Sequence, residues 1–332
     1  MPTGRYPCGV CITGYCVVIG GANMDLLGSP SNTLLGRTSN PGYVSTSPGG
    51  VGRNIADNLT RLQQACWLMA PLGDDANGRF LAQHCQQLGI EIQALSVLKG
   101  QPTSTYLSIV DEHGEMQVAI ADMGLIDGFG EAHLKPHVDH LRAATLVAMD
   151  TNLSAACLHY VCATLTEKPL FVDTVSMAKA VRIKPHLQHI HSLKPNLCEA
   201  QAIAGTDYGP SPTDAQLSCL ARWFLQQGVR HLYLSLGAQG VLYSGPKQQF
   251  LMALKEPSKA PEMINSNGAG DAMMAGLCAA WIQGLDASDR VAYGVACAQI
   301  AMSSQATINP QISHQLIHRM LKEYPCQMTP LR

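Results

Sequence analysis

The chain has 332 residues, of which 46% are hydrophobic and 14% are charged, and its formal net charge at pH 7 is −2. This composition excludes a disordered chain, and the slight negative charge argues against binding to nucleic acid or to an acidic membrane surface. The length fits one large α/β domain, or a core with a small appendage, so small molecules are the expected partners.

Twelve cysteines are scattered through the chain, mostly inside apolar stretches. The sequence opens without a charged segment followed by an apolar one, and its most apolar windows are interrupted by glycines or by Asp271. We therefore expect a cytoplasmic protein without a membrane span. Cys8 and Cys11 have the spacing of metal ligands, but no second pair completes a zinc site, so residues 1–14 are expected to be an N-terminal extension.

The first predicted element is a buried strand at residues 16–20, where a short β-branched run ends in glycine. Asn23 and Asp25 follow it and are expected on the loop at its carboxyl end. Ligands of open α/β sheets gather at this edge, so both side chains are candidates for substrate contacts. Asp25 is suited to accept hydrogen bonds from two vicinal hydroxyls of a ribose, and its structural alternative is to cap the loop.

Two segments depart from the pattern of a buried sheet. Residues 28–46 are rich in Gly, Ser, Thr and Pro, and residues 103–122 alternate in polarity on either side of a turn at 111–114, which is typical of a hairpin. Together they predict a small β lid over the site. A hairpin on the edge of the main sheet is an equally good interpretation of the periodicity alone.

A glycine-rich turn with the sequence GGVGRN at 49–54 precedes a helical pattern at 55–62. It is not a dinucleotide fingerprint, because an isoleucine stands where the third glycine belongs, and the chain contains no GxxxxGK[ST] phosphate loop. Glycines let the backbone approach a polyhydroxylated substrate closely, and an asparagine can both donate and accept hydrogen bonds. Gly49, Gly50 and Asn54 are therefore candidate substrate contacts, with a tight turn that caps the helix as the structural alternative.

The rest of the chain alternates short apolar strands with helical patterns, which predicts a mostly parallel sheet with helices on both faces. No internal repeat and no linker divides the chain, and we expect one core domain at residues 15–325. The predicted strands lie at 65–70, 145–149, 169–172, 190–194 and 231–236, and the predicted helices at 75–88, 154–165 and 197–204.

The most informative segment is NSNGAGD at 265–271, which leads into an apolar helical pattern. The backbone N–H groups of Gly268, Ala269 and Gly270 have no partner within the helix and lie at the positive end of its dipole, so they predict an anion hole for a transferring phosphoryl group. Asp271 follows directly. A carboxylate beside an anion hole is suited to accept a proton from an attacking hydroxyl, which indicates a kinase.

With both glycine-rich motifs in this order, the chain resembles the ribokinase-like (PfkB) carbohydrate kinase family from about residue 17 to about residue 310. Supporting segments are GDDxxG at 73–78, KPNLCE at 194–199 and SLGAQG at 235–240. The resemblance implies a ribokinase-like fold and a phosphotransfer that uses ATP and Mg²⁺, with Asp271 as the base. It further implies an anion hole at Gly268, Ala269 and Gly270, phosphate and magnesium contacts at Asn196 and Glu199, and an ATP side at Ser235, Gly237, Gly240 and Asn267.

Asn196 and Glu199 also fit this role on physical grounds. An amide and a carboxylate at the end of a strand can hold a hydrated Mg²⁺ through few protein oxygens, with Glu199 acting through water. Glu199 is equally an acidic first-turn residue that the helix dipole favours. Asn152 and Lys179 are further substrate candidates, whose alternatives are a helix cap and a solvated helix charge.

Within the family, the segments at 103–107, 171–180 and 189–195 are most similar to members that phosphorylate the C-nucleoside pseudouridine. Thr105, in the first of these segments, joins the substrate candidates. The resemblance thus implies transfer from ATP to the 5′-hydroxyl of pseudouridine, which gives ADP and pseudouridine 5′-phosphate. Another sugar or nucleoside kinase, such as a ribokinase or an adenosine or inosine kinase, and a noncatalytic nucleoside sensor stay open.

Two further properties follow from the resemblance. Many members carry Asp-Thr where this chain has Asn265 and Ser266, and the acidic residue contributes to a monovalent-cation site. With Asn265 in its place, a potassium requirement is possible but is not implied. Subunits of this family can pair along the exposed edge of the lid, so a homodimer through the lid is expected.

Overall fold

The structure is a computed structural model that describes residues 14–331. Its strands are β1 (Cys16–Ile19), β2 (Asn23–Pro30), β3 (Gly42–Gly49), β4 (Cys66–Met69), β5 (Pro71–Gly73), β6 (Ser96–Leu98), β7 (Thr105–Val110), β8 (Met116–Asp122), β9 (Leu146–Asp150), β10 (Leu170–Asp173), β11 (Ser192–Lys194), β12 (His231–Ser235), β13 (Val241–Ser244), β14 (Gln249–Leu254) and β15 (Cys326–Pro330). Its α-helices are α1 (Val51–Arg61), α2 (Ala76–Gln87), α3 (Glu131–Leu134), α4 (Val138–Ala143), α5 (Ala155–Thr164), α6 (Met177–Ala180), α7 (Leu197–Ala204), α8 (Asp214–Gln226), α9 (Ala269–Ile282), α10 (Ala287–Met302) and α11 (His314–Glu323). Short 3₁₀ segments lie at Gly124–Gly128, Lys135–His137, Val181–His189, Gly237–Gln239 and Pro257–Lys259.

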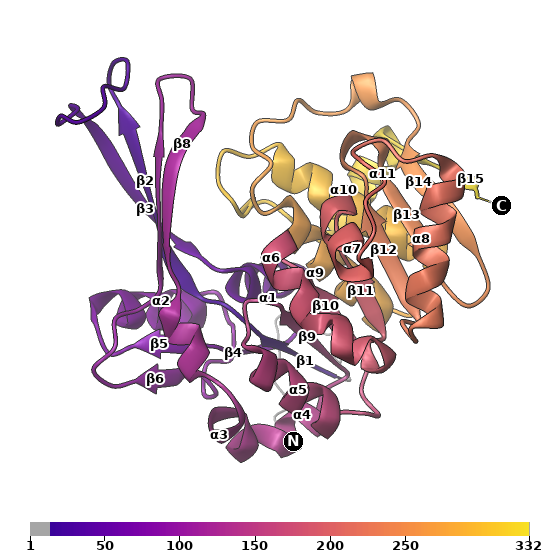
Figure 1. The fold of residues 1–332 in the computed structure, drawn as a ribbon, viewed down its shortest axis with the longest axis horizontal. Helices are drawn as coiled ribbons and strands as arrows, with labels where there is room; N and C mark the ends of the chain where they lie inside the picture. The colour runs from indigo at the N-terminus through magenta and orange to yellow at the C-terminus, as the bar shows by residue number, and fades with distance from the viewer. Residues whose placement is uncertain (1–13, 332) are drawn as a thin grey trace.

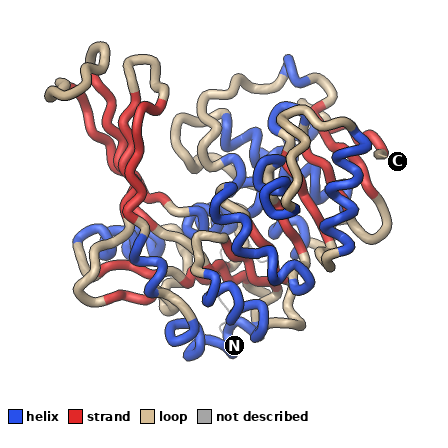
Figure 2. The backbone as a smooth tube through the Cα atoms, in the orientation of Figure 1, coloured by secondary structure: helices blue, strands red, loops and turns tan. Residues whose placement is uncertain are grey.

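The main sheet has nine strands in the order β15-β14-β13-β12-β11-β10-β9-β1-β4. Six neighbouring strands of this sheet, β4, β1, β9, β10, β11 and β12, run parallel. The strands β13, β14 and β15 extend the edge beside β12 and are antiparallel. Helices cover both faces of this sheet (Figures 1 and 2), which confirms the architecture expected from the alternation of strands and helices. None of the helices within residues 14–331 is long and apolar enough to cross a bilayer.

The side chains of β1 alternate between the two layers of the core, one on each face of the sheet. Cys16 and Val18 pack into the cluster that contains α1, α9, α10 and α11, while Val17 and Ile19 pack into the cluster that contains α5, α7 and α8. All four side chains are fully buried. Because successive side chains of a strand point to opposite faces, this apolar run satisfies both layers at once, as expected for a central parallel strand.

The order in which the chain adds strands to the sheet reverses beside β1. It passes from β1 to β4 on one side and later returns to β9 on the other side of β1. Loops that leave neighbouring strands in opposite directions open a crevice at the carboxyl ends of those strands, which is the usual ligand position in open α/β sheets. In this chain, that edge of the sheet is where Gly20, after β1, and Asp150, at the end of β9, pack against each other.

A separate four-stranded sheet, in the order β3-β2-β7-β8, forms the lid. Figure 1 shows it standing away from the body, and its ends lead into the carboxyl edge of the main sheet. The predicted segments 28–46 and 103–122 both belong to it, so the lid interpretation is favoured over an edge hairpin of the main sheet. One face of β8 exposes Met116, Val118 and Ile120, with 61%, 53% and 61% of their surfaces accessible. The expected pairing of two lids in a homodimer stays a prediction.

Three boundaries differ from those expected. Asn23 and Asp25 lie in β2, not in a loop, because strand pairing with β3 and β7 draws them into the lid. Helix α1 begins at Val51 rather than at residue 55, since Gly50 takes a positive φ of 96° and starts the helix there. Strand β15 continues the main sheet beyond residue 325. Cys8 and Cys11, with the rest of residues 1–13, lie outside the described residues.

Close packing of two helices fixes the position of α9, whose first turn carries Asp271. A Cβ added at Gly276 would lie 2.6 Å from Cys297 Sγ and 3.2 Å from Gly294 Cα on α10. The backbones of α9 and α10 therefore approach one another closely at this point. Since cores are packed nearly as densely as organic crystals, little space is available to absorb a larger side chain.

We expect Gly276→Val to destabilise the fold by about 2–3 kcal/mol, because overpacking pushes α9 away from α10. Urea denaturation measures this loss. Gly124→Val is the matched control, because a Cβ there meets no atom within 4 Å, and its effect should stay within about 0.5 kcal/mol. Equal stability of the Gly276→Val protein and the wild type would contradict the close packing.

Candidate active site

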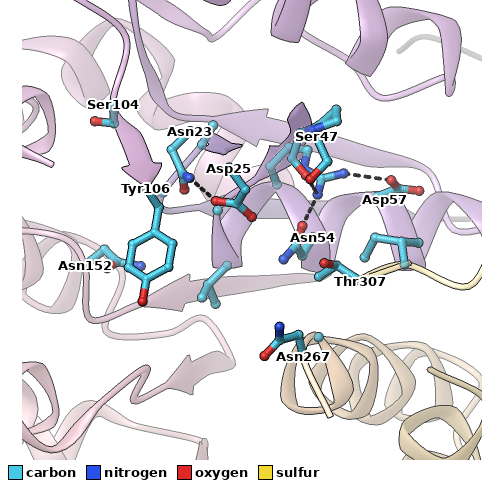
Figure 3. Close-up of a pocket in the computed structure, with 18 of the residues that line it drawn as sticks. Asn23, Asp25, Ser47, Asn54, Asp57, Ser104, Tyr106, Asn152, Asn267 and Thr307 are labelled. Atoms are coloured by element: carbon cyan, nitrogen blue, oxygen red, sulfur yellow. Dashed lines mark hydrogen bonds and ion pairs between the residues drawn. The ribbon is translucent and has the colours of Figure 1, made fainter. Parts of the chain in front are cut away.

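A cleft of about 700 Å³ opens at the carboxyl edge of the main sheet, beneath the lid. Its walls come from segments far apart in the sequence: Asp25 and Tyr106 of the lid, Asn152 after β9, and Asn267 before α9 (Figure 3). Asn54 of α1 lies between them. The volume is typical of a small-molecule site.

The structure brings together about half of the residues proposed from the sequence. Those that line the cleft are Asn23, Asp25, Gly50, Asn54, Asn152, Lys179, Asn267 and Gly268. Those that do not line it are Gly49, Thr105, Asn196, Glu199, Ser235, Gly237, Gly240, Ala269, Gly270 and Asp271.

On the lid side, Asn23 and Asp25 form a polar pair. Asn23 Nδ2 donates a hydrogen bond of 2.6 Å to Asp25 Oδ1. Burial raises the pKa of Asp25, an effect that the Asn23 amide and the positive charge of Arg53 partly offset. Gly49 supports this pair from behind, because a Cβ there would lie 2.4 Å from the Asp25 carboxylate. Any other residue at position 49 would displace Asp25.

The neighbouring lid strand β7 contributes different residues from the one expected. Tyr106 and Ser108 of β7 and Ser104 just before it line the cleft, whereas Thr105 does not and donates its hydroxyl to Thr103 O at 3.2 Å. Side chains of a strand alternate between its two faces, so Thr105 points away when its neighbours point in. Sequence similarity identified the correct segment but not the face.

At the other end of the cleft, the two glycine-rich turns meet. Asn54 Nδ2 donates a hydrogen bond of 2.7 Å to Asp271 Oδ2, which joins α1 to the first turn of α9. Asp271 is 9% exposed. It does not line the cleft itself, but it is hydrogen-bonded to Asn54, which does. The carboxylate predicted as the base therefore lies at the edge of the cleft and is reached past Asn54.

Burial raises the pKa of Asp271 to about 7, and the negative charges of Asp173 and Asp150 contribute to the shift. The Asn54 hydrogen bond and the positive charge of Lys194 lower it in part. A carboxyl group with such a pKa can accept and release a proton near neutral pH.

The turn before α9 has the backbone geometry of an anion site. Gly268 takes φ 77°, and a Cβ there would lie 2.2 Å from Thr307 O, so glycine is required. The Ala269 N–H makes a long hydrogen bond of 3.4 Å to Ser266 O, which corrects the expectation that it is free. At Gly270, a Cβ would lie 3.2 Å from Lys194 Nζ, so this amine reaches the mouth of the helix.

Sequence reasoning missed a row of charged residues beside Asp271. Asp150, Asp173 and Lys194 end β9, β10 and β11 and stand in register with one another. Lys194 Nζ lies 3.0 Å from Asp173 Oδ2. Asp150 accepts hydrogen bonds from the backbone N–H groups of Gly21 and Asn152, while burial raises its pKa to about 6. Asp150 and Asp173 directly follow predicted strands and Lys194 ends one, but the strand order that brings them together could not be read from these positions.

Val175 is a second residue that the sequence did not single out. It lines the cleft with φ 60°, a conformation that a β-branched residue adopts only under strain. Its N–H donates to Asp173 Oδ1 at 3.0 Å, which holds the strained turn in place. On the same wall, Lys179 Nζ donates a hydrogen bond of 2.6 Å to Asn152 Oδ1. Strain of this kind is concentrated at functional sites.

Most residues proposed for the phosphates and ATP lie outside the cleft, whereas Asn267 lines it. Asn196 caps α7, and Glu199 Oε2 accepts hydrogen bonds from Asn196 N and from Thr174 Oγ1 at 2.9 and 2.6 Å. The structural alternative for this pair, a capped helix start, is therefore present in the fold. Ser235, the last residue of β12, forms a parallel β-bridge with Asn196. The turn that follows contains Gly237 and Gly240, with φ of 59° and 99°. Among residues 14–331, no three His, Cys, Asp or Glu side chains cluster as metal ligands.

Asn265 closes the loop in front of the anion site. Its Nδ2 donates a hydrogen bond of 3.0 Å to Gln305 O, and its Oδ1 accepts one of 2.9 Å from Asn267 N. Both ends of the amide are therefore used within the protein.

Comparison with known proteins identifies the family. The pfkB family carbohydrate kinases match residues 13–314 of the chain. Pseudouridine kinase from Escherichia coli K12 is 36% identical over 312 residues, which cover 94% of this chain and 98% of that protein. The uncharacterized sugar kinase YeiI from the same strain is 37% identical over 300 residues, or 90% of this chain and 81% of that protein.

A solved structure shows the same fold. Arabidopsis thaliana ribokinase complexed with ribose and ATP superposes with a TM-score of 0.83, covering 94% of this chain and 99% of that chain at 20% identity. The fold is thus ribokinase-like, as the two glycine-rich motifs indicate. The chain belongs to the pfkB family of carbohydrate kinases, whose members transfer a phosphoryl group to an alcohol.

Proposed function

We propose that this protein is an ATP-dependent kinase that phosphorylates the 5′-hydroxyl of pseudouridine. The similarity to Escherichia coli pseudouridine kinase, at 36% identity over 94% of the chain, supports this substrate. YeiI, described as a sugar kinase, is similar to the same degree, so a kinase for another sugar or nucleoside is the second candidate.

One contact carries the proposal, the hydrogen bond from Asn54 to Asp271. It holds a carboxylate with a pKa of about 7 between the cleft and the mouth of α9. Burying a carboxylate costs free energy, and such a cost is retained where function requires it, so a sensor that only binds nucleosides gains nothing from a buried base at this point. The contact therefore favours a kinase over a noncatalytic sensor.

The lid pair would hold the sugar. Asp25 carries two acceptor oxygens, and Asn23 keeps the carboxylate oriented into the cleft. Vicinal ribose hydroxyls donate to such a carboxylate as a pair. The 5′-hydroxyl would then point along the cleft toward Asn54 and Asp271.

On the opposite wall, Asn152, Val175 and Lys179 would contact the base. The uracil ring presents both N–H donors and carbonyl acceptors, which match an amide and an ammonium group. Burial lowers the pKa of Lys179, although the Asp150 carboxylate acts in the opposite direction. Closure of the lid would exclude water and so limit wasteful hydrolysis of ATP.

The phosphates would lie at the positive end of α9, near the Lys194 amine. Mg²⁺ usually keeps several waters and takes one or two protein carboxylates, so Glu199 acting through water suits it without a dedicated cage. The ion would neutralise charge on the transferring phosphoryl group. Asp271 accepts the proton of the attacking hydroxyl late in the transfer, because the transition state is loose. Ser235, Gly237 and Gly240 would line the nucleotide, with Asn196 and Asn267 beside its phosphates.

We further propose that activity does not depend on potassium. The two hydrogen bonds of Asn265 close the loop that a bound cation would otherwise organise. Rates of phosphoryl transfer measured in potassium, sodium and choline salts should therefore be equal, and a higher rate in potassium alone would contradict this.

A panel of acceptors tests the substrate. Purified protein with ATP and Mg²⁺ should phosphorylate pseudouridine with the highest kcat/KM among pseudouridine, uridine, adenosine, ribose and fructose. Product analysis by mass spectrometry identifies the phosphorylated hydroxyl. A strong preference for a free sugar would overturn the assignment, and no transfer to any acceptor would overturn the kinase itself.

Asp271→Asn should lower kcat by about 10²–10⁴-fold, because the amide cannot accept the proton. In the wild type, kcat should be constant above pH 7 and fall about tenfold per pH unit below it, since protonation of Asp271 removes the base. Asp214→Asn, an acidic residue in the first turn of α8, is the control and should retain normal turnover. Normal turnover of Asp271→Asn would exclude Asp271 as the base.

Asp25→Ala should weaken nucleoside binding about 10–100-fold, the range expected when a charged hydrogen-bond acceptor is lost. Isothermal titration calorimetry without ATP measures the dissociation constant directly. Asp122→Ala removes an exposed lid carboxylate that does not line the cleft, and it should bind as the wild type does. An unchanged dissociation constant for Asp25→Ala would refute the clamp.

A further inference from the structure

Arg53 is a buried cation that the mechanism above does not use. It is 2% exposed, and three of its nitrogens are engaged by acceptors from two elements. Nη1 donates to Asp57 Oδ2 at 2.9 Å, which neutralises its charge within α1. Nε and Nη2 donate to Gly49 O and Pro48 O at 3.3 and 2.7 Å. Arg53 thus fastens the end of lid strand β3 to helix α1.

The same guanidinium also holds the side chain of the next residue. Arg53 Nη2 donates to Asn54 Oδ1, and Asn54 Nδ2 donates to Asp271 Oδ2. A guanidinium can only donate and an ionised carboxylate can only accept, so the Asn54 amide has one orientation that satisfies both neighbours. With the guanidinium removed, the amide would be free to turn its oxygen toward Asp271.

These contacts form a continuous path from the lid to the predicted base. It runs from the carbonyls at the end of β3 through Arg53 and Asn54 to Asp271. From these contacts, and given the kinase function proposed above, we infer that Arg53 is a positioning residue: it orients Asn54 so that its N–H faces Asp271, and it ties that orientation to the seating of the lid.

Other charged residues near Asp271 also affect its pKa. Asp150 and Asp173 from β9 and β10 repel the charge on Asp271, whereas Lys194 from β11 and Arg53 from α1 attract it. Loss of Arg53 therefore removes a nearby positive charge and releases the amide. Both changes favour the protonated carboxyl, so the acidic limb of the kcat profile should move to higher pH.

Arg53→Gln tests this inference, with the acceptor that the wild type phosphorylates best. We expect kcat to fall about 10–100-fold, the acidic limb to move up by about one pH unit, and acceptor-independent ATP hydrolysis to rise relative to transfer. Arg61→Gln is the matched control. Arg61 binds the other oxygen of Asp57 at 2.6 Å but does not touch Asn54, and its profile should keep the wild-type limb.

A double-mutant cycle with Asn54→Ala shows whether Arg53 acts through Asn54. If it does, adding Arg53→Gln to Asn54→Ala should lower kcat by less than about threefold, because the path is already broken. If the losses of kcat in the two single variants add fully in the double variant, and the acidic limb of the kcat profile does not move, the inference is overturned and Arg53 is a purely structural residue. An inactive wild type would instead overturn the proposed function, so the two failures are distinct.

Arg53→Lys guards against misfolding, because it keeps the buried charge but cannot reach both β3 and Asn54. The acidic limb of the kcat profile of Arg53→Lys should also move to higher pH, but by less than that of Arg53→Gln. If neither Arg53 variant folds, Asn54→Asp tests the link from Asn54 to Asp271 with Arg53 intact, because its ionised carboxylate still accepts from Arg53 but cannot donate to Asp271. The limb should then move up by more than one pH unit, and an unmoved limb would overturn the inference.

Discussion

The hydrogen bond between Asn54 and Asp271 unites two turns that are 217 residues apart in the sequence. Each turn alone is an ordinary glycine-rich helix start, with Gly50 and Gly268 in positive φ conformations. Together they place an amide and a carboxylate where the cleft meets the mouth of α9. Helix α9 packs closely on α10, and α1 packs closely on the end of β1, where a Cβ on Gly52 would lie 2.8 Å from Gly20 Cα; this packing holds the two turns in place. The proposed chemistry depends on that register, because a base must lie within hydrogen-bond reach of the hydroxyl it serves.

The surroundings of Asp271 show what such a site costs in stability. Asp150, Asp173 and Asp271 are all buried. Lys194 is a positive partner of Asp173 and Asp271, and Arg53 also attracts Asp271. Burial by itself lowers the pKa of Lys194, but the carboxylates of Asp173, Glu199 and Asp271 more than offset this and raise it. A set of like charges without enough counter-charge would not be favoured by folding alone. Such a set fits a site that takes up a cation, and the Mg²⁺ that accompanies ATP would supply that positive charge.

Local patterns predicted the elements well, because periodicity reports which face of a strand or helix is buried. The strands at 65–70 and 145–149, the helix at 197–204 and the lid hairpin all follow from apolar spacing and turn residues. Patterns failed where distant pairing decides the outcome. Asn23 and Asp25 look like loop residues, but β3 and β7 pair with them and make them strand. The neighbourhood of Asp150, Asp173 and Lys194 depends on strand order, and the role of Arg53 depends on the contact between Asn54 and Asp271, which are 217 residues apart, so a single sequence could not reveal either.

The central claim is that Asp271 receives the proton of the hydroxyl that attacks phosphorus. A crystal structure with pseudouridine and a nonhydrolysable ATP analogue bound with Mg²⁺ tests it most directly. The account predicts the 5′-oxygen within about 2.6–3.2 Å of an Asp271 carboxylate oxygen and in line with the terminal phosphorus, beneath a closed lid. A well-ordered nucleoside whose 5′-oxygen contacts another group, with Asp271 turned away from the cleft, would contradict it.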